Sequence, residues 1–151
     1  MSGSVYMGIL LKRGITGFYE KGDLCLNETD FREFVRICYL LQTVFKIKST
    51  VNMEYASYFS AELTDGKSKI YFLLNKYCNV GGFTDNLIFG DKIFTDINLD
   101  NNYLIECEIV PAVVLNSAFS ETKHDLSQCE LEQVKYYSPV SVGNIIFNEW
   151  D

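Results

Sequence analysis

Residues 59–75 read FSAELTDGKSKIYFLLN, and this stretch predicts an antiparallel hairpin. Its centre, Asp65-Gly66, is a strong two-residue turn signal. Apolar residues alternate with other residues on both sides of the turn: Phe59, Ala61 and Leu63 precede it, and Ile70, Phe72 and Leu74 follow it. A period of two is typical of strands with one buried face. We therefore expect two paired strands between about Met53 and Asn75.

One long helix is predicted ahead of the hairpin, from Thr29 to about Phe45. Apolar residues recur there at spacings of three and four, which places them in one stripe of a helix: Phe31, Phe34, Val35, Cys38, Leu41 and Phe45. Asn27 or Thr29 can cap its start, since both side chains accept hydrogen bonds from backbone N–H groups. Acidic residues occupy its first turns, where the helix dipole favours negative charge.

Beyond the hairpin the pattern predicts short strands. Asn79-Val80-Gly81-Gly82 is interpreted as a break in the chain, and residues 87–89 and 92–94 as short strands. A long strand is predicted from Tyr103 to Leu115, with Pro111 at its edge or in a bulge. Near the N-terminus, residues 5–11 are apolar and fit either a strand or a helix start, and the glycines around them favour a strand.

The C-terminal part predicts helices again. Asp125 or Ser127 can cap a helix that runs to about Tyr137, and Ser141 can cap a last segment from Val142 to Trp150. We find no repeat and no linker, so residues 1–151 are expected to form a single domain. The predicted class is α+β: an antiparallel sheet of about five to six strands packed with one long N-terminal-half helix and C-terminal helices.

Composition narrows the classes of function. The chain has 151 residues, 48% of them hydrophobic, and a net charge of -7. A surplus of acid argues against a general nucleic-acid binder and against electrostatic docking on an anionic membrane. The N-terminus shows no signal-peptide pattern, and no apolar stretch approaches the roughly 20 residues of a membrane span. We therefore expect a soluble, cytoplasmic protein.

The five cysteines indicate free thiols in a reducing compartment. Cys25, Cys38, Cys78, Cys107 and Cys129 are odd in number and widely spaced, and no two form the short pair typical of structural zinc sites. We expect no metal and no cofactor.

The chain carries no catalytic signature, although three weak candidates stand out. His124 beside Asp125 could act as a general base. Residues 96–101 contain Asp96, Asn98, Asp100 and Asn101, which resemble a loose calcium loop without the glycine and terminal glutamate of an EF-hand. Glu106 and Glu108 fall on one face of the predicted strand, where two carboxylates could do acid/base work.

The negative charge is concentrated in one part of the sequence. Residues 1–80 hold ten basic side chains and eight acidic ones, whereas residues 81–134 hold two basic and ten acidic side chains. A surface of one sign speeds association with an oppositely charged partner and excludes others. The predicted partner-binding residues are Asp85, Asp91, Asp96, Asp100, Tyr103, Glu106 and Glu108, with Tyr103 as an aromatic anchor.

The last residues suggest a family. Residues 136–151 read YYSPVSVGNIIFNEWD, which resembles the tails of immunity-type proteins encoded beside polymorphic bacterial toxins, including systems of contact-dependent growth inhibition. The resemblance implies a cytoplasmic protein that binds and neutralises one cognate toxin, often a nuclease, and it implies no particular binding residues. The tail itself is expected to close the core, with Trp150 as its anchor.

The sequence therefore predicts a non-enzymatic immunity protein that covers the active site of a basic toxin domain with an acidic face. Two alternatives remain open. One is a small hydrolase-like enzyme that uses Glu106 and Glu108, and the other is a structural or adaptor protein that self-associates through an exposed strand. The sequence leaves the oligomeric state undecided.

Overall fold

The computed structural model describes residues 10–18, 28–42, 45–88, 90–97 and 106–150. In chain order, its elements are α1 (Phe31–Tyr39), β1 (Lys46–Asn52), β2 (Tyr58–Thr64), β3 (Lys69–Asn75), β4 (Val80–Thr84), β5 (Phe94–Thr95), β6 (Glu108–Ile109), α2 (Ala112–Leu115), the 3-10 helix η2 (Phe119–Glu121), α3 (Gln128–Tyr137) and α4 (Val142–Ile146). The predicted α+β class is confirmed.

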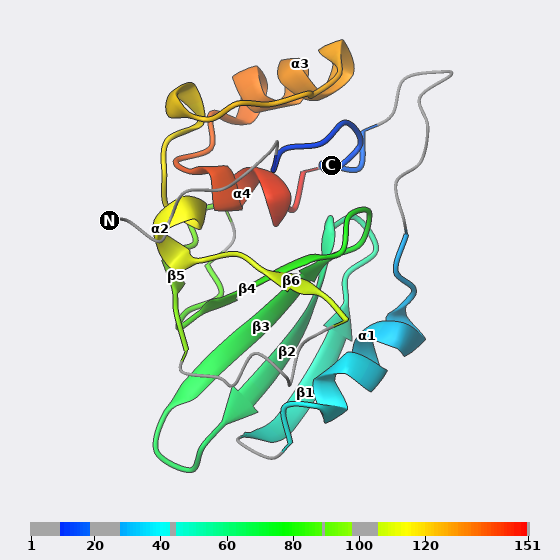
Figure 1. Ribbon diagram of the computed structural model, residues 1–151, viewed down its shortest axis with the longest axis vertical. Coiled ribbons are helices and arrows are strands. Elements are labelled where there is room, and N and C mark those ends of the chain that lie inside the picture. Colours follow the sequence, from blue (N-terminus) through cyan, green and yellow to red (C-terminus); the bar gives the residue numbers. More distant parts are fainter. Residues whose placement is uncertain (1–9, 19–27, 43–44, 89, 98–105, 151) are drawn as a thin grey trace.

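The strands form one sheet in the order β1-β2-β3-β4-β5, with each neighbouring pair antiparallel. β6 is parallel to β4 and pairs with its first two residues, whereas β5 pairs with its last two. β5 and β6 therefore border β4 one after the other along the same edge, and Figure 1 shows both beside it. An antiparallel sheet of five to six strands is what the sequence predicts.

The hairpin at the centre of the sheet is confirmed, but its loop has four residues, 65–68, and not the predicted two. β2 and β3 pair in continuous register, with Ala61 opposite Phe72. Gly66 adopts a φ of 94°, a left-handed conformation that glycine adopts at little cost. The Asp65 carboxylate accepts hydrogen bonds of 2.9 Å from the backbone N–H groups of Lys67 and Ser68, and these bonds lower the pKa of Asp65. The turn is thus closed by its own side chain.

The N-terminal-half helix is shorter than predicted. α1 ends at Tyr39 instead of near Phe45, because the chain turns at Leu40–Gln42 to enter the sheet at β1. Leu41 and Phe45 still pack on the same side, so the apolar spacing extends beyond the helix itself. The N-cap is Asp30, whose side chain accepts from the Glu33 N–H at 2.8 Å, and not Asn27 or Thr29.

One face of the sheet packs against α1 through aromatic rings. The Phe34 ring lies 5.3 Å from that of Phe59 and 5.7 Å from that of Phe72, and the Phe72 ring lies 5.2 Å from that of Phe83. Such offset contacts add to the free energy gained from apolar burial. Cys38 of α1 and Cys107, just before β6, are buried in the same cluster.

The other face packs against the C-terminal part of the chain. The residues of α4 are buried, and α4 lies between the sheet and α3 in Figure 1. Glu130 of α3 connects this layer to residues 10–18: its buried carboxylate accepts from the N–H groups of Gly14 (2.9 Å) and Thr16 (3.1 Å). The same carboxylate closes a capping box with Ser127, which confirms Ser127 as the helix start.

The double glycine is part of a strand, so its interpretation as a break is wrong. Gly81 and Gly82 lie inside β4 and are buried. A Cβ at Gly81 would lie 3.0 Å from the Phe72 ring, and one at Gly82 would lie 2.6 Å from a methyl of Leu115. Glycine is found in strand interiors where another group approaches closely. Here the missing side chains let both layers reach β4.

The strand predicted from Tyr103 to Leu115 is wrong for its described part, residues 106–115. Only Glu108–Ile109 is β6, and Pro111 is the N-cap of α2. Proline fits a helix start because it lacks the N–H that a helix interior would need. The Asp96 carboxylate accepts from the Ala112 N–H at 2.8 Å and so satisfies a backbone donor of this first turn.

The remaining strand predictions are borne out in part. Of residues 92–94 only Phe94 belongs to a strand, β5, and Leu87 and Ile88 lie outside strands. Residues 5–9 lie outside the described part of the chain, and Leu11 forms a single bridge with His124. Ser141 is the N-cap of α4, which ends at Ile146 and not at Trp150. In the described ranges no helix has the length and apolar character needed to cross a bilayer.

The close approach at β4 makes a prediction. Gly82→Ala places a methyl group against Leu115, so we expect it to lower the free energy of unfolding by about 1–3 kcal/mol. Urea denaturation measures this cost. Combining Gly82→Ala with Leu115→Val shortens the opposing side chain and makes room for the methyl group. The loss of stability in this double variant should therefore be smaller than the sum of the losses in the two single variants. Additive losses would contradict the packing described for Gly82.

The buried thiols make a second prediction. Burial raises the pKa of Cys38 and of Cys107 from 9.0 to about 12. A smaller part of the rise at Cys38 comes from the charge of Cys107, and a smaller part of the rise at Cys107 comes from the charge of Glu106. In the unfolded chain a thiol loses its proton near pH 9, so between pH 9 and 12 the unfolded state binds fewer protons. The free energy of unfolding therefore falls as pH rises, by about 1.4 kcal/mol per pH unit for each thiol.

Cys38→Ala tests this dependence. Denaturation across that pH range should give a shallower loss of stability than in the unaltered chain, whatever the constant cost of the smaller side chain. Equal slopes for the two proteins would show that the thiol of Cys38 is not responsible.

Candidate functional site

Five of the predicted binding residues lie along one edge of the sheet, on or beside β4, β5 and β6. Asp85 and Asp91 lie in the connection from β4 to β5, Asp96 follows β5, and Glu106 and Glu108 lie just before and within β6. All five are exposed, and together they are called the acidic edge. The other two predicted residues, Asp100 and Tyr103, lie outside the described residues.

The charges of the acidic edge differ in their partners. The Glu106 carboxylate lies 2.5 Å from the guanidinium of Arg36 on α1, so its charge is partly balanced. The Asp96 carboxylate accepts from the backbone at α2. The carboxylates of Asp85, Asp91 and Glu108 make no hydrogen bond or ion pair with another described residue. These three carboxylates are therefore open to a partner.

Glu106 and Glu108 are both exposed with the buried Cys107 between them, but only Glu108 belongs to a described strand. Glu106 precedes β6 and pairs with Arg36, whereas Glu108 lies in β6. Burial raises the pKa of the Cys78 thiol, the charge of Lys12 lowers it, and the charge of Glu108 raises it. The Glu106 carboxylate is thus engaged by an arginine, whereas that of Glu108 has no ion-pair partner among the described residues.

The other candidate sites gain no support. His124 is exposed, its Nδ1 accepts from the Leu126 N–H at 3.2 Å, and its ring lies 5.1 Å from that of Phe119. Asn98, Asp100 and Asn101 of the supposed calcium loop are outside the described residues. Among the residues that are described, no group of three or more His, Cys, Asp or Glu side chains could hold a metal ion.

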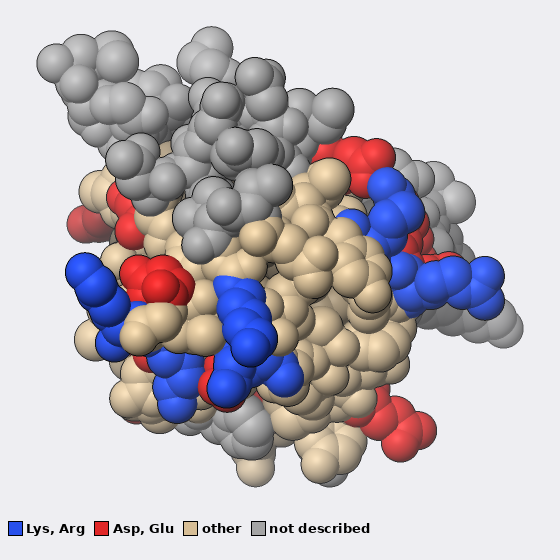
Figure 2. Space-filling model, turned by 90° about the horizontal axis from the view of Figure 1, so that it is seen from below, with Lys and Arg blue, Asp and Glu red and all other residues tan. Residues whose placement is uncertain are grey.

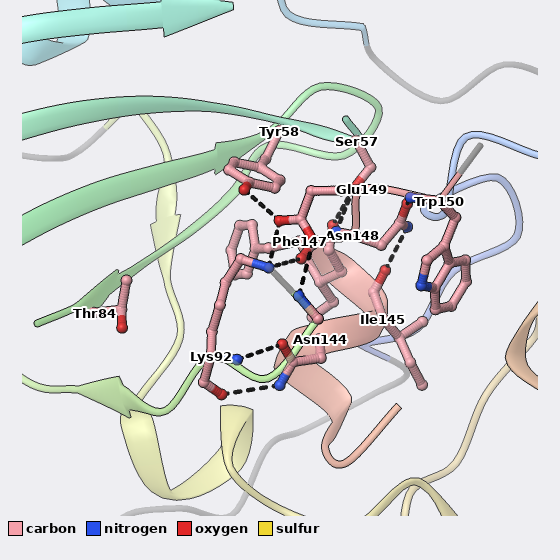
Figure 3. A network of polar contacts seen from close by, with 12 residues as sticks. Ser57, Tyr58, Thr84, Lys92, Asn144, Ile145, Phe147, Asn148, Glu149 and Trp150 are labelled. Carbon is pink, nitrogen blue, oxygen red and sulfur yellow. Dashed lines mark hydrogen bonds and ion pairs between the residues drawn. The ribbon is translucent and has the colours of Figure 1, made fainter. Parts of the chain in front are cut away.

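A buried ion pair that the sequence did not reveal lies behind the acidic edge. The side chain of Lys92 is 0% exposed, and its Nζ lies 2.5 Å from the Glu149 carboxylate and donates to the Phe147 carbonyl at 3.0 Å. The Tyr58 hydroxyl donates to the same carboxylate, and its ring lies 5.2 Å from Nζ. Figure 3 shows these groups pointing toward one another from the sheet, the β4–β5 connection and the tail.

The burial of this cluster shifts its proton equilibria. Desolvation lowers the pKa of Lys92, and the Glu149 carboxylate works against that shift. Desolvation raises the pKa of Tyr58, and the charge and hydrogen bond of Glu149 raise it further. A buried lysine is expensive unless it is paired. The contacts of these three side chains join distant parts of the fold, so the cluster has a structural role.

Two asparagines fix the backbone beside this ion pair. The Asn144 side chain accepts from the Lys92 N–H at 2.8 Å and donates to the Lys92 carbonyl at 2.9 Å. The Asn116 side chain does the same for Phe94, with both distances 2.9 Å. Each amide thus supplies the donor and acceptor that a neighbouring strand would supply. Ile93, between the two clamped residues, is 77% exposed.

The opposite end of the sheet is basic. Lys46 and Lys48 of β1 and Lys67 and Lys69 at the hairpin are exposed. Figure 2 shows Lys and Arg side chains gathered in groups on the lower face of the molecule. A shallow groove of about 700 Å³ lies beside β1 and the hairpin turn, lined by Gln42, Phe45, Lys46, Ile47, Thr64, Asp65 and Gly66. Figure 2 also shows Asp and Glu side chains between these basic groups, so this face carries both signs of charge.

Comparison with protein-family models, with curated proteins and with solved structures finds no match. The resemblance of residues 136–151 to immunity-protein tails stays a prediction. In this fold the tail closes the core: α4 is buried, and the Trp150 ring is stacked on that of Tyr137 at 5.1 Å.

The buried ion pair leads to a prediction. Glu149→Gln leaves the Lys92 ammonium buried without a negative partner, so we expect the free energy of unfolding to fall by about 3–5 kcal/mol. Chemical denaturation measures this loss. Adding Lys92→Met removes the uncompensated charge. The amide at position 149 can still accept a hydrogen bond from the Tyr58 hydroxyl. The double variant should therefore be more stable than Glu149→Gln alone. A less stable double variant would contradict the charge pairing.

Proposed function

We propose that this chain is an immunity protein that binds and neutralises a basic toxin domain through the acidic edge. The observation that carries the proposal is the set of exposed carboxylates on one edge of the sheet, of which those of Asp85, Asp91 and Glu108 have no partner among the described residues. Like charges on one surface repel each other and do not stabilise the fold. A basic partner would be attracted to these carboxylates and would reduce the repulsion among them.

The partner best matched to such a surface is a nuclease domain. A nuclease needs a positive active site to hold phosphates, and an acidic protein surface can occupy that site in place of the nucleic acid. Charge complementarity also raises the rate of association, which suits an inhibitor that must act before its target reaches a substrate. The resemblance of the tail to immunity proteins points to the same class.

The site of action that we propose is the cytoplasm. Among the described residues, Cys38, Cys78 and Cys107 are buried and form no disulfide. Free thiols suit a reducing compartment. A nuclease toxin would also meet its nucleic acid there.

The two alternatives have less support. The enzyme hypothesis relies on Glu106 and Glu108, and the Glu106 carboxylate is already paired with the Arg36 guanidinium at 2.5 Å. Self-association through an edge strand would use β1, which carries Lys46 and Lys48 and has an irregular register between Ile47 and Ser49. Lysines and bulges are features that discourage edge-to-edge pairing.

Charge reversal tests the proposal. The product of the neighbouring gene, which the proposal expects to carry the basic toxin domain, is titrated with the unaltered chain and with the double variant Asp85→Lys/Asp91→Lys. Because two exposed attractive charges become repulsive, we expect affinity to fall by about a hundredfold or more at an ionic strength of about 0.15 M, mostly through slower association. Asp96 is left unchanged because its carboxylate accepts from the first turn of α2.

The control variant is Glu132→Lys/Glu121→Lys, which makes the same change in net charge at exposed positions in α3 and η2. We expect its affinity to stay within about threefold of the unaltered chain, since distant charges are screened by salt. Equal losses in both double variants would show that net charge, and not the acidic edge, governs binding. Absence of binding by the unaltered chain would contradict the proposed function itself.

A further inference from the structure

We propose that Ile93 is the apolar anchor of the partner interface. This inference rests on the proposed function. The acidic edge attracts the toxin domain, and the Ile93 side chain then holds it. Charge alone gives rate and selectivity, whereas tight binding usually depends on a few residues buried at the centre of an interface. Ile93 has the exposure, the fixed backbone and the position for that role.

The exposure of Ile93 is unusual for its surroundings. Its neighbours Lys92 and Phe94 are almost fully buried, while Ile93 itself is 77% exposed, the largest exposed fraction among the large aliphatic side chains of the described residues. Exposed and buried side chains alternate from Asp91 to Phe94, where the chain enters β5. Burial of its neighbours therefore forces Ile93 outward.

The backbone that carries Ile93 is held from both sides. Asn144 and Asn116 clamp residues 92 and 94, and the Thr84 hydroxyl donates to the Ile93 carbonyl at 2.7 Å. The buried side chain of Lys92 anchors the same segment to Glu149. A residue fixed in its bound position loses little conformational entropy when a partner closes over it. Ile93 is thus pre-organised for binding.

The charges around Ile93 define its occupant. Asp91 precedes it by two residues, Asp96 follows it by three, and both are exposed. Ile88, in the same connection, is also exposed. The complementary surface is an apolar pocket rimmed by lysine or arginine side chains. We therefore assign the occupant as the basic toxin domain and not a second copy in a symmetric contact, where one acidic edge would face and repel the other.

The experiment compares two truncations of exposed aliphatic side chains. Ile93→Ala removes the anchor, and Val51→Ala is the control, since Val51 is 44% exposed on β1 at the opposite edge of the sheet. Both variants are expected to fold, and thermal denaturation checks this. Calorimetric titration of the same toxin domain should show affinity about tenfold or more weaker for Ile93→Ala and within about twofold for Val51→Ala.

A salt series separates the anchor from the charges. Raising the salt concentration to about 1 M shortens the screening length to about 3 Å, so the penalty of Asp91→Asn should largely disappear. The penalty of Ile93→Ala should persist, because burial of an apolar side chain does not depend on charge. A penalty for Ile93→Ala that fades with salt in parallel with that of Asp91→Asn would overturn the inference.

The outcomes distinguish this inference from the proposed function. Binding by the unaltered chain with equal affinity for Ile93→Ala overturns the anchor and leaves the immunity function standing. No binding by the unaltered chain overturns both. Sedimentation of the chain alone tests the other occupant: dimers that dissociate in Ile93→Ala, with toxin affinity unchanged, would assign Ile93 to a self-interface and overturn the inference.

Discussion

The fold depends on one buried charge, the ammonium group of Lys92, being neutralised by Glu149 at the C-terminal end of the chain. A lysine without access to water requires a negative partner and hydrogen-bond acceptors, and the tail supplies both through the Glu149 carboxylate and the Phe147 carbonyl. Because these groups follow α4 directly, the pairing holds α4 against the sheet. It also fixes the β4–β5 connection, so the core and the acidic edge are positioned by the same contact.

The layers around the sheet follow from this arrangement and from the glycines of β4. The tail can pack closely only where the strand has no side chains, and Gly82 leaves that space for Leu115, with the Phe147 ring next to it. On the opposite face the aromatic rings of α1 and the hairpin fill the core. One face is thus held by apolar packing and the other by packing combined with a polar network.

The hairpin, the α+β class and the helix starts at Ser127 and Ser141 could be predicted because turn chemistry, alternation and caps are local signals. The extent of α1, the strand character of Gly81-Gly82 and the helix at 112–115 could not, because each is decided by what packs against it. The exposure of the five described acidic residues agrees with the charge pattern. The roles of Lys92, Asn116 and Asn144 depend on contacts between distant segments, which no local pattern of the sequence records.

The buried network makes residues 92–94 a rigid part of the fold, so that the acidic edge and Ile93 are presented in one conformation. Native-state hydrogen exchange of the Lys92 and Phe94 amides tests this rigidity most directly, since both N–H groups donate to clamping asparagines. We expect these amides to exchange as slowly as those at the centre of β3, through global unfolding. Exchange through local opening, much faster than in β3, would contradict a rigid segment.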